Sequence, residues 1–527
     1  QPGTECRATQ LVFGAGFIIP NASAIDHEDN LVMMIKADYT PEIRFFSGRG
    51  DTLGASYPLS FNRYRHLLVK INPQGVPQWM TYVEHESVFA DVTDVKADSD
   101  GNIYAAYYHS DAFSNVDIYS TDGRRHPLVP GGSELSAAIV LLKYDKYGRL
   151  IWNTTMPDWY ATDNIDIELD SQGNILLMGA IGISKLNQNG QILWTVPWDL
   201  NTRGFADIVT GAGGEIYSVD NYHLTVRKIT PEGVMSVLFG PATYFDDPGL
   251  SDGITADAIR LDEEGNIYVC GNFYGGVIIN GVWYSDPLFN DDEPDPFVMK
   301  LKSDGTPDWF NRLVFEGSQP KGKGFDVRGG KIGYYSYCSA GTSITAAGQS
   351  PVSLSGPGHF LWTLDTDGDN ENVQIIHQHQ QQPCETLIPY DVFHFHPNTG
   401  DISMLYDIHE SEQWGDQVYY PLDFEFPGCN QLLTRGGSDC FSIPEVSVTG
   451  PAEESLKIIP NPASGIVFMD LEASPEYLEI ANQSGVVLYN LRNPGKHFDT
   501  SRLANGFYTV KAVLDGKWYV ARLIVIH

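Results

Sequence analysis

The sequence predicts an all-β protein: a seven-bladed β-propeller over residues 1–445, a linker over 446–456, and a small immunoglobulin-like β-sandwich over 457–527. Three observations predict this fold class. One hairpin pattern recurs seven times, a second hairpin pattern alternates with it, and the pattern changes after the last copy. Two hairpins make four strands, and four-stranded units that repeat every 41 residues or more are typical of a β-propeller. The seven copies therefore predict seven blades.

The first hairpin consists of two apolar strands around a turn. It reads VKADSDGNIYAAYY at 95–108, and similar copies begin at residues 24, 167, 208, 259, 327 and 395. Gly and Asn tolerate the positive φ that such turns need. The turn residues are Asp29, Gly101, Gly173, Gly214, Gly265, Gly330 and Gly400, so successive copies are separated by 72, 72, 41, 51, 65 and 70 residues.

The second hairpin places a Lys five residues before a turn Gly and a Trp four residues after that Gly. It reads LLVKINPQGVPQW at 67–79, and its Trp residues are Trp79, Trp152, Trp194 and Trp309. We expect these rings to pack between blades, because buried aromatic side chains usually serve the core. Only six second hairpins are clear. We therefore expect an N-terminal strand within Thr9–Phe17 to complete the seventh blade and close the ring.

Composition and charge exclude several classes of function. The chain carries 33 Lys and Arg against 67 Asp and Glu, a net charge of −34, which disfavours nonspecific binding to nucleic acid or to an anionic membrane. It has no run of 18 apolar residues, so we expect no membrane insertion. From residue 456 onward, 7 Lys and Arg face 6 Asp and Glu, so the acidity belongs to the propeller. We find no catalytic motif, so the sequence favours a non-catalytic protein and leaves an enzyme as the alternative.

Extra residues enter the repeats at one position, after the first hairpin and before the second. Loops from one blade position emerge on one face of a propeller, so this face is the predicted binding surface. Rigid aromatic side chains are good anchors for sugars or proteins. The alternative is that these side chains pack the loops themselves. The predicted binding residues are Tyr107, Tyr108, Phe113, Tyr119, Phe273, Tyr274, Trp283 and Tyr284.

Acidic residues and cysteines suggest further chemistry. Asp365, Asp367 and Asp369 place oxygen ligands at alternate positions, which predicts a calcium site, with a plain Asp/Gly turn as the alternative. The six cysteines lack CxxC spacing, which argues against zinc. We favour a disulfide between Cys429 and Cys440, or between Cys6 and one of them, and free buried thiols are the alternative. His377, His379, His394 and His396, with Cys384, form a weaker transition-metal alternative.

Two resemblances follow from these motifs. The D-x-x-G-N-I-Y and K-x-x-x-x-G-x-x-x-W elements resemble those of bacterial β-propeller repeat proteins. The last 70 or so residues resemble the type A C-terminal sorting domain of the Bacteroidetes type IX secretion system, through IIPNPASG, IANQSGVVL, LANGFYTVKA and ARLIVIH. The residues that carry this second resemblance are Pro460, Asn461, Pro462, Gly465, Gly485, Gly506 and Tyr508.

The second resemblance implies an interaction with the type IX secretion machinery. It also implies passage through the periplasm and delivery to the outer cell surface or the medium. Since the sequence begins at Gln1, we expect a signal peptide to have been removed.

These features together predict a secreted or cell-surface binding or adhesion protein, whose insertion loops bind a surface protein or a glycan. A secreted polysaccharide hydrolase or lyase is one alternative, and it requires convergent carboxylates or His near the propeller axis. An accessory component of the export or surface-filament machinery is the other. No cofactor is expected apart from the calcium considered above.

Overall fold

A computed structural model describes the strands and tight turns of the chain between Arg7 and Val525. Short gaps lie in many loops, and the longer segments outside the description are 1–6, 110–115, 129–137, 158–164, 198–204, 245–252, 286–294, 379–392, 420–429, 437–453, 460–465 and 526–527. The chain divides into two compact units, Gln1–Phe441 and Ser442–His527. Within the described segments every regular element is a strand. Accordingly, they contain no helix of the length and apolarity needed to cross a membrane.

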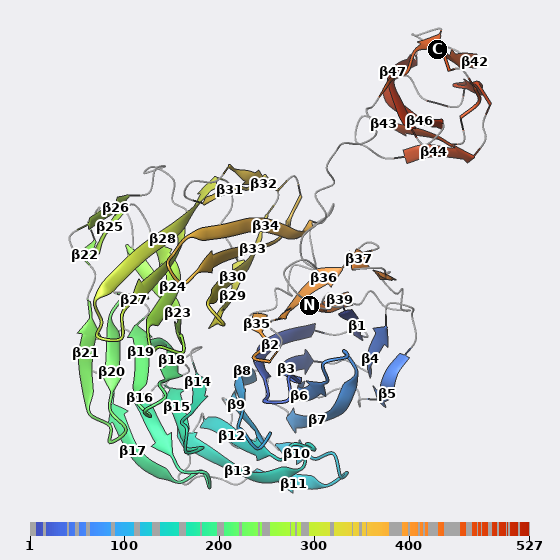
Figure 1. The fold of residues 1–527 in the computed structure, drawn as a ribbon. Coiled ribbons are helices and arrows are strands. Elements are labelled where there is room, and N and C mark those ends of the chain that lie inside the picture. The colour runs from blue at the N-terminus through green and yellow to red at the C-terminus, as the bar shows by residue number, and fades with distance from the viewer. Residues whose placement is uncertain are drawn as a thin grey trace. The chain divides into compact units, whose positions relative to one another are not determined.

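The first unit is a seven-bladed β-propeller, as the repeats predict (Figure 1). Each blade is a four-stranded antiparallel sheet. Blades 1 and 2 consist of β2 (Phe17–Ile25), β3 (Leu31–Asp38), β6 (Tyr64–Ile71) and β7 (Pro77–His85), then β8 (Ala90–Ala97), β9 (Ile103–His109), β12 (Ala138–Tyr144) and β13 (Leu150–Pro157). Blades 3 and 4 consist of β14 (Asp166–Leu169), β15 (Ile175–Gly179), β16 (Gly182–Leu186) and β17 (Ile192–Pro197), then β18 (Phe205–Thr210), β19 (Ile216–Asp220), β20 (Val226–Ile229) and β21 (Met235–Phe239).

The remaining three blades follow the same order. Blades 5 and 6 consist of β23 (Ile254–Leu261), β24 (Ile267–Phe273), β27 (Asp295–Leu301) and β28 (Pro307–Glu316), then β29 (Lys321–Arg328), β30 (Lys331–Cys338), β33 (Gly358–Asp365) and β34 (Asn370–Gln378). Blade 7 consists of β35 (Phe393–Phe395), β36 (Ile402–Ile408), β39 (Asn430–Gly436) and the N-terminal β1 (Arg7–Phe13). β1 pairs antiparallel with β39, with Arg7 opposite Arg435. This pairing confirms the predicted closure of the ring by an N-terminal strand.

The first strands of the blades surround the ring axis. Neighbours in the series β2, β8, β14, β18, β23, β29, β35 contact each other, and β35 returns to contact β2. The apolar core lies between adjacent blades, because each blade buries both faces. One cluster joins Val32 and Leu68 of blade 1 to Val95 and Val140 of blade 2. Neighbouring blades thus share their cores, which is why no single repeat is expected to fold alone.

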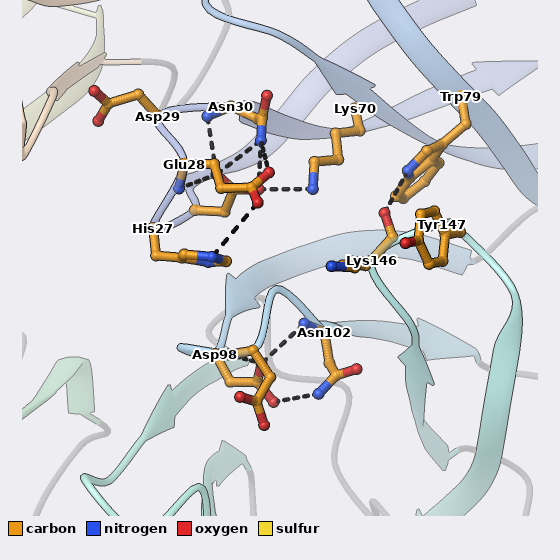
Figure 2. Close-up of polar contacts among 12 residues, drawn as sticks. His27, Glu28, Asp29, Asn30, Lys70, Trp79, Asp98, Asn102, Lys146 and Tyr147 are labelled. Carbon is orange, nitrogen blue, oxygen red and sulfur yellow. Dashed lines mark hydrogen bonds and ion pairs between the residues drawn. The ribbon is translucent and has the colours of Figure 1, made fainter.

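The repeated D-x-x-G-N and related motifs form the tight turns (Figure 2). In blade 1, the Asp26 carboxylate accepts hydrogen bonds from the backbone amides of Glu28 and Asn30, both at 2.9 Å, and pairs with the Lys70 ammonium at 2.7 Å. Asp98 accepts hydrogen bonds from the amides of Asp100 and Asn102 in the same way in blade 2. These side chains replace the backbone partners that the turn leaves free.

The four repeated Trp residues tie blades 1, 2, 3 and 5 to the blade that follows each of them. The Trp79 indole donates to the Lys146 carbonyl at 3.0 Å, and Trp152, Trp194 and Trp309 donate to the carbonyls of Gln188, Pro231 and Thr366 at 3.0–3.1 Å. Each acceptor lies in the last tight turn of the following blade. The predicted packing of these rings between blades is confirmed.

The second unit has two sheets around one core. β40 (Glu454–Ser455), β47 (Lys517–Val525), β46 (Gly506–Leu514), β43 (Tyr477–Asn482) and β44 (Val487–Arg492) form one sheet. β41 (Ile458–Ile459), β42 (Ile466–Met469) and β45 (His497–Asp499) form the other. Val467 and Phe498 of the small sheet and Leu478 and Val510 of the large sheet share the buried core. An immunoglobulin-like topology stays a prediction.

Candidate functional site

The segments inserted between the second and third strands of the blades emerge at one face of the ring, which we call the insertion face. Because strands alternate in direction, the tight turns lie at the opposite face. Three of the inserted segments form hairpins that add to the outer strand of the preceding blade. β4 (Glu42–Ser47) pairs with β1, β10 (Asp117–Tyr119) pairs with β7, and β31 (Ser343–Ala346) pairs with β28. The second strands of these hairpins are β5 (Thr52–Pro58), β11 (Arg125–Pro127) and β32 (Val352–Ser353).

Two further insertions complete this face. β25 (Gly276–Ile279) and β26 (Val282–Ser285) of blade 5 pair with β22 (Thr243–Tyr244), which follows the last strand of blade 4. β37 (Glu412–Trp414) and β38 (Gln417–Tyr419) of blade 7 form a separate hairpin. The five insertion-bearing blades are therefore 5, 6, 7, 1 and 2, which are consecutive in the ring.

The hairpin of blade 2 is held on blade 1 by polar and aromatic contacts. The Tyr119 ring stacks on Tyr82 with 4.4 Å between ring centroids, and the Thr81 hydroxyl donates to the Tyr119 carbonyl. Within the hairpin, Arg125 pairs with Asp117 at 2.6 Å. These contacts fix the hairpin backbone, so part of the insertion face is a rigid surface.

The predicted aromatic binding residues take different positions. Tyr107 on β9 and Phe273 on β24 are fully buried, with exposed fractions of 0%. Tyr108 and Tyr119 are half-buried. Trp283 and Tyr284 lie on β26, while Phe113 and Tyr274 lie outside the described residues. A binding role for the eight stays a prediction, and the protein itself already covers the rings of Tyr107 and Phe273.

A cluster of histidines lies beneath the insertion face between blades 1 and 2. The His66 and His85 rings are 4.8 Å apart between centroids, His85 and His109 are 5.6 Å apart, and His66 lies 5.2 Å from Tyr107. All four side chains are buried. Burial raises the pKa of the Tyr107 phenol well above its usual value. Nearby, the buried Arg65 guanidinium pairs with Glu84 at 2.8 Å.

Charged side chains on the first strands form a second cluster around the axis, which we call the inner charge network: Asp94, Lys96, Asp166, Glu168, Asp207, Arg260 and Asp326. Its carboxylates link consecutive blades through backbone amides. Asp94 accepts from Ile167 at 3.1 Å, Asp166 from Ile208 at 3.0 Å, Asp207 from Ile259 at 2.9 Å, and Asp326 from Phe395 at 2.8 Å.

Lys96 gathers three of these carboxylates. Its ammonium lies 3.1 Å from Asp94, 3.2 Å from Glu168 and 3.9 Å from Asp166. The four side chains keep exposed fractions of 13–25%, so solvent reaches them. Arg260 pairs with Asp207 on the other side of the network.

The network separates the pKa values of its carboxyl groups. Burial, together with the charges of Asp94 and Asp207, raises the pKa of Asp166 well above its ordinary value. Burial also raises the pKa of Glu168, although Lys96 opposes the change. Burial also tends to raise the pKa of Asp94. The charge of Lys96 and the hydrogen bond with Asp166 outweigh this effect, so the pKa of Asp94 is lowered. Asp166 therefore keeps its proton to a higher pH than Asp94 does.

The predicted calcium ligands lie at a tight turn. The Asp365 carboxylate accepts hydrogen bonds from the amides of Asp367 and Asp369 at 3.0 and 2.9 Å, as in the other turns. His394 and His396 each bond a serine hydroxyl, of Ser23 and Ser403, at 2.7 Å. In the described part of the chain, no three His, Cys, Asp or Glu side chains are arranged to hold a metal ion. The calcium site stays a prediction.

The other predicted residues are only partly described. Tyr508 is buried in the core of the second unit, and Gly506 begins β46. Cys270 and Cys338 are buried, with exposed fractions of 0%. The sorting residues 460–465 and Gly485, and the cysteines at 6, 384, 429 and 440 with both favoured disulfides, lie outside the described residues.

Sequence reasoning missed the inner charge network. A signal for it exists, because Asp94, Asp166 and Asp207 each lie seven residues before the turn glycine of their blade and precede an apolar residue. That spacing places them on the innermost strand. The pairing of the inserted hairpins with the preceding blade had no comparable signal.

Comparisons with known proteins complete the description. Residues 457–526 match the family model of the secretion system C-terminal sorting domain. Over 165 residues the chain is 24% identical to an uncharacterised WD repeat-containing protein of Acanthamoeba polyphaga mimivirus, and the match covers 31% of this chain. The chain spans only 11% of the length of that curated relative.

Two solved structures are similar in part. PorZ, an essential surface component of the type IX secretion system of Porphyromonas gingivalis, is 11% identical, with a TM-score of 0.28 over 96% of this chain and 81% of that chain. Virginiamycin B lyase of Staphylococcus aureus is 12% identical, with a TM-score of 0.32 over 63% of this chain and 96% of that chain. At these scores neither structure carries an argument about activity. The family match, by contrast, confirms the sorting domain expected from the C-terminal motifs.

Proposed function

Because a type IX sorting domain marks this chain as a secreted or cell-surface protein, we propose that it is a binding protein whose insertion face holds a surface protein or a glycan. The observation that carries the proposal is the consecutive placement of five insertion-bearing blades, while blades 3 and 4 join their second and third strands directly. Binding residues concentrate on loops that a rigid scaffold positions. The asymmetry supports one side of the insertion face as the binding surface.

The hairpins make this surface suitable for binding. Three of them add to the outer strand of a neighbouring blade, so the first strand of each hairpin is paired on both sides before a partner arrives. A preorganised surface loses less conformational freedom on binding than free loops of the same length. The inserted segments therefore supply a shaped surface without a large entropic cost.

The experiment shortens the insertions one at a time. Residues 110–137 of blade 2 or 339–357 of blade 6 are replaced by a two-residue link like residues 180–181 of blade 3. Binding to the native cell surface and to a glycan array is measured for each variant. A matched control, Asp304→Asn, removes an acidic side chain from a tight turn at the opposite face. The proposal expects binding to fall about tenfold or more in at least one shortened variant and to persist in the control.

Two results would redirect the proposal. Unchanged binding in both shortened variants contradicts it, provided that thermal melts show folded proteins. A stoichiometric partner from the secretion machinery supports the accessory role instead. Passage through the periplasm is part of the same proposal, and detection of the full chain in that compartment before export tests it.

One observation favours enzymatic cleavage of a polysaccharide as a second candidate function. Asp166 and Glu168 both have raised pKa values and lie near the ionised Asp94, and carboxyl groups held in different protonation states are the pattern that acid–base catalysis uses. A screen of polysaccharides with the wild type and with Asp166→Asn tests it. Product release by the wild type that the variant lacks supports cleavage, and no release from any substrate counts against it.

A further inference from the structure

Most of the strongly exposed apolar side chains in the described part of the chain gather on the outer rim of blades 2, 3 and 4. They lie on β13, β17 and β21 or in the tight turns that lead into these strands, which follow one another along the outside of the ring (Figure 1). We call this set the rim patch: Tyr147, Ile151, Ile192, Leu193, Val234 and Val237, with exposed fractions of 52–64%. The two other strongly exposed apolar residues, Ile466 and Phe468, belong to the second unit.

The blade fold itself does not require apolar residues at these positions. Ile151 and Leu193 each lie three residues after a turn glycine and directly before a cross-blade Trp. The equivalent residues of blades 1 and 5 are Gln78 and Asp308, and these blades form the same turn and the same Trp hydrogen bond. Apolar side chains that stay exposed to water do not stabilise the folded monomer. Clusters of such side chains mark interaction sites.

The outer edge of β17, the last strand of blade 3, carries no further strand in the described sheets. β21, the last strand of blade 4, ends its described sheet in the same way. In blades 1, 5 and 7 the corresponding strand instead carries one of the hairpins of the chain itself. Backbone N–H and C=O groups along a free edge accept an added strand. The fold therefore already binds extended segments at the equivalent edge in three places.

We propose that the rim patch binds an extended segment of a partner protein, which adds a β-strand to β17 and covers Ile192 and Leu193 with apolar side chains. β17 belongs to blade 3, which has no inserted hairpin, so this inference does not rest on the proposed function. The partner segment is neutral or basic, because residues 1–455 carry 26 Lys and Arg against 61 Asp and Glu, a net charge of −35. The same charge opposes a second copy of the chain as the occupant.

The test uses a photo-crosslinking amino acid, p-benzoylphenylalanine, in the full-length chain. It replaces Leu193 in one variant and Gln78, the equivalent residue of blade 1, in the control. Both proteins are applied to native cells, irradiated and analysed by mass spectrometry. The proposal expects one cross-linked protein from position 193, attached through an apolar or basic segment, and none of it from position 78.

The purified partner is then bound to the wild type, to the double variant Ile192→Asp with Leu193→Asp, and to Gln78→Asp. We expect the double variant to raise Kd about tenfold or more, while Gln78→Asp leaves it within about twofold. Melting temperatures within about 2 °C of the wild type show that the variants are folded. Cross-linking only to a second copy, equal cross-linking from both positions, or an unchanged Kd in the double variant would each overturn the proposal.

Discussion

Replacement of Asp207 tests whether the inner charge network holds neighbouring blades together. The Asp207 carboxylate accepts hydrogen bonds from the Ile208 amide at 2.9 Å and from the Ile259 amide of the next blade at 2.9 Å. It also pairs with Arg260. Asp207→Ala leaves two buried amides without this acceptor, at about 1–2 kcal/mol each. Arg260 is 32% exposed, so water compensates most of its lost partner. The expected loss is about 2–4 kcal/mol.

This loss converts into a measurable change in Tm. A unit of 441 residues has an unfolding entropy of about 0.9 kcal/mol per kelvin, so the variant is expected to melt about 2–4 °C below the wild type. Differential scanning calorimetry of the full chain is the assay. Asp304→Asn removes one negative charge from an exposed turn and is expected to melt with the wild type. If Asp207→Ala melts within 1 °C of the wild type, the carboxylate does not link the blades energetically.

Three further predictions concern local contacts. Gly148→Ala places a Cβ 2.6 Å from Thr121 and 2.9 Å from Trp79. The control is Gly123→Ala, since Gly123 has a similar positive φ (77° against 78° at Gly148) and no atom within 4 Å of the added Cβ. Gly148→Ala should therefore lower Tm more than Gly123→Ala, and equal melting temperatures would refute the clash. Burial lowers the pKa of His394 to about 4, so its neutral form stabilises the fold fully above pH 6.5 and this contribution is lost as pH falls toward 4. The variant His394→Gln should show a shallower fall in Tm between pH 6.5 and 4, and a parallel fall would contradict this. Tyr107→Phe removes a buried hydroxyl that has no hydrogen-bond partner in the described structure, so it should keep or raise Tm, and a drop of several degrees would show that the hydroxyl is satisfied.

The blades were predictable because their motifs act locally. Asp98 and Gly101 form a turn within five residues, and Trp79 reaches the next turn through a spacing that recurs at Trp152, Trp194 and Trp309. The closing strand was predictable for a different reason: six second hairpins in a seven-bladed ring leave the seventh blade incomplete, and the N-terminal segment was available to complete it. The repeat pattern of the sequence therefore predicted the ring, the number of its blades and the way it closes.

The binding surface was less predictable because strand length and non-local pairing decide it. Tyr107 and Phe273 were expected in loops, but β9 runs to His109 and β24 ends at Phe273, so strand alternation turns both rings into the core. The hairpin at Asp117–Tyr119 pairs with a strand more than 30 residues earlier, and three residues carry no recognisable strand pattern. Pairing of this kind depends on tertiary context.

Hydrogen-exchange footprinting of the full chain, free and bound to a captured partner or glycan, tests the central claim most directly. The account predicts that added protection concentrates in the inserted hairpins, at 42–58, 117–127 and 343–353, and leaves the tight turns at the opposite face unchanged. Protection confined to those tight turns, or to the first strands around the axis, would contradict the assignment of the insertion face as the binding surface.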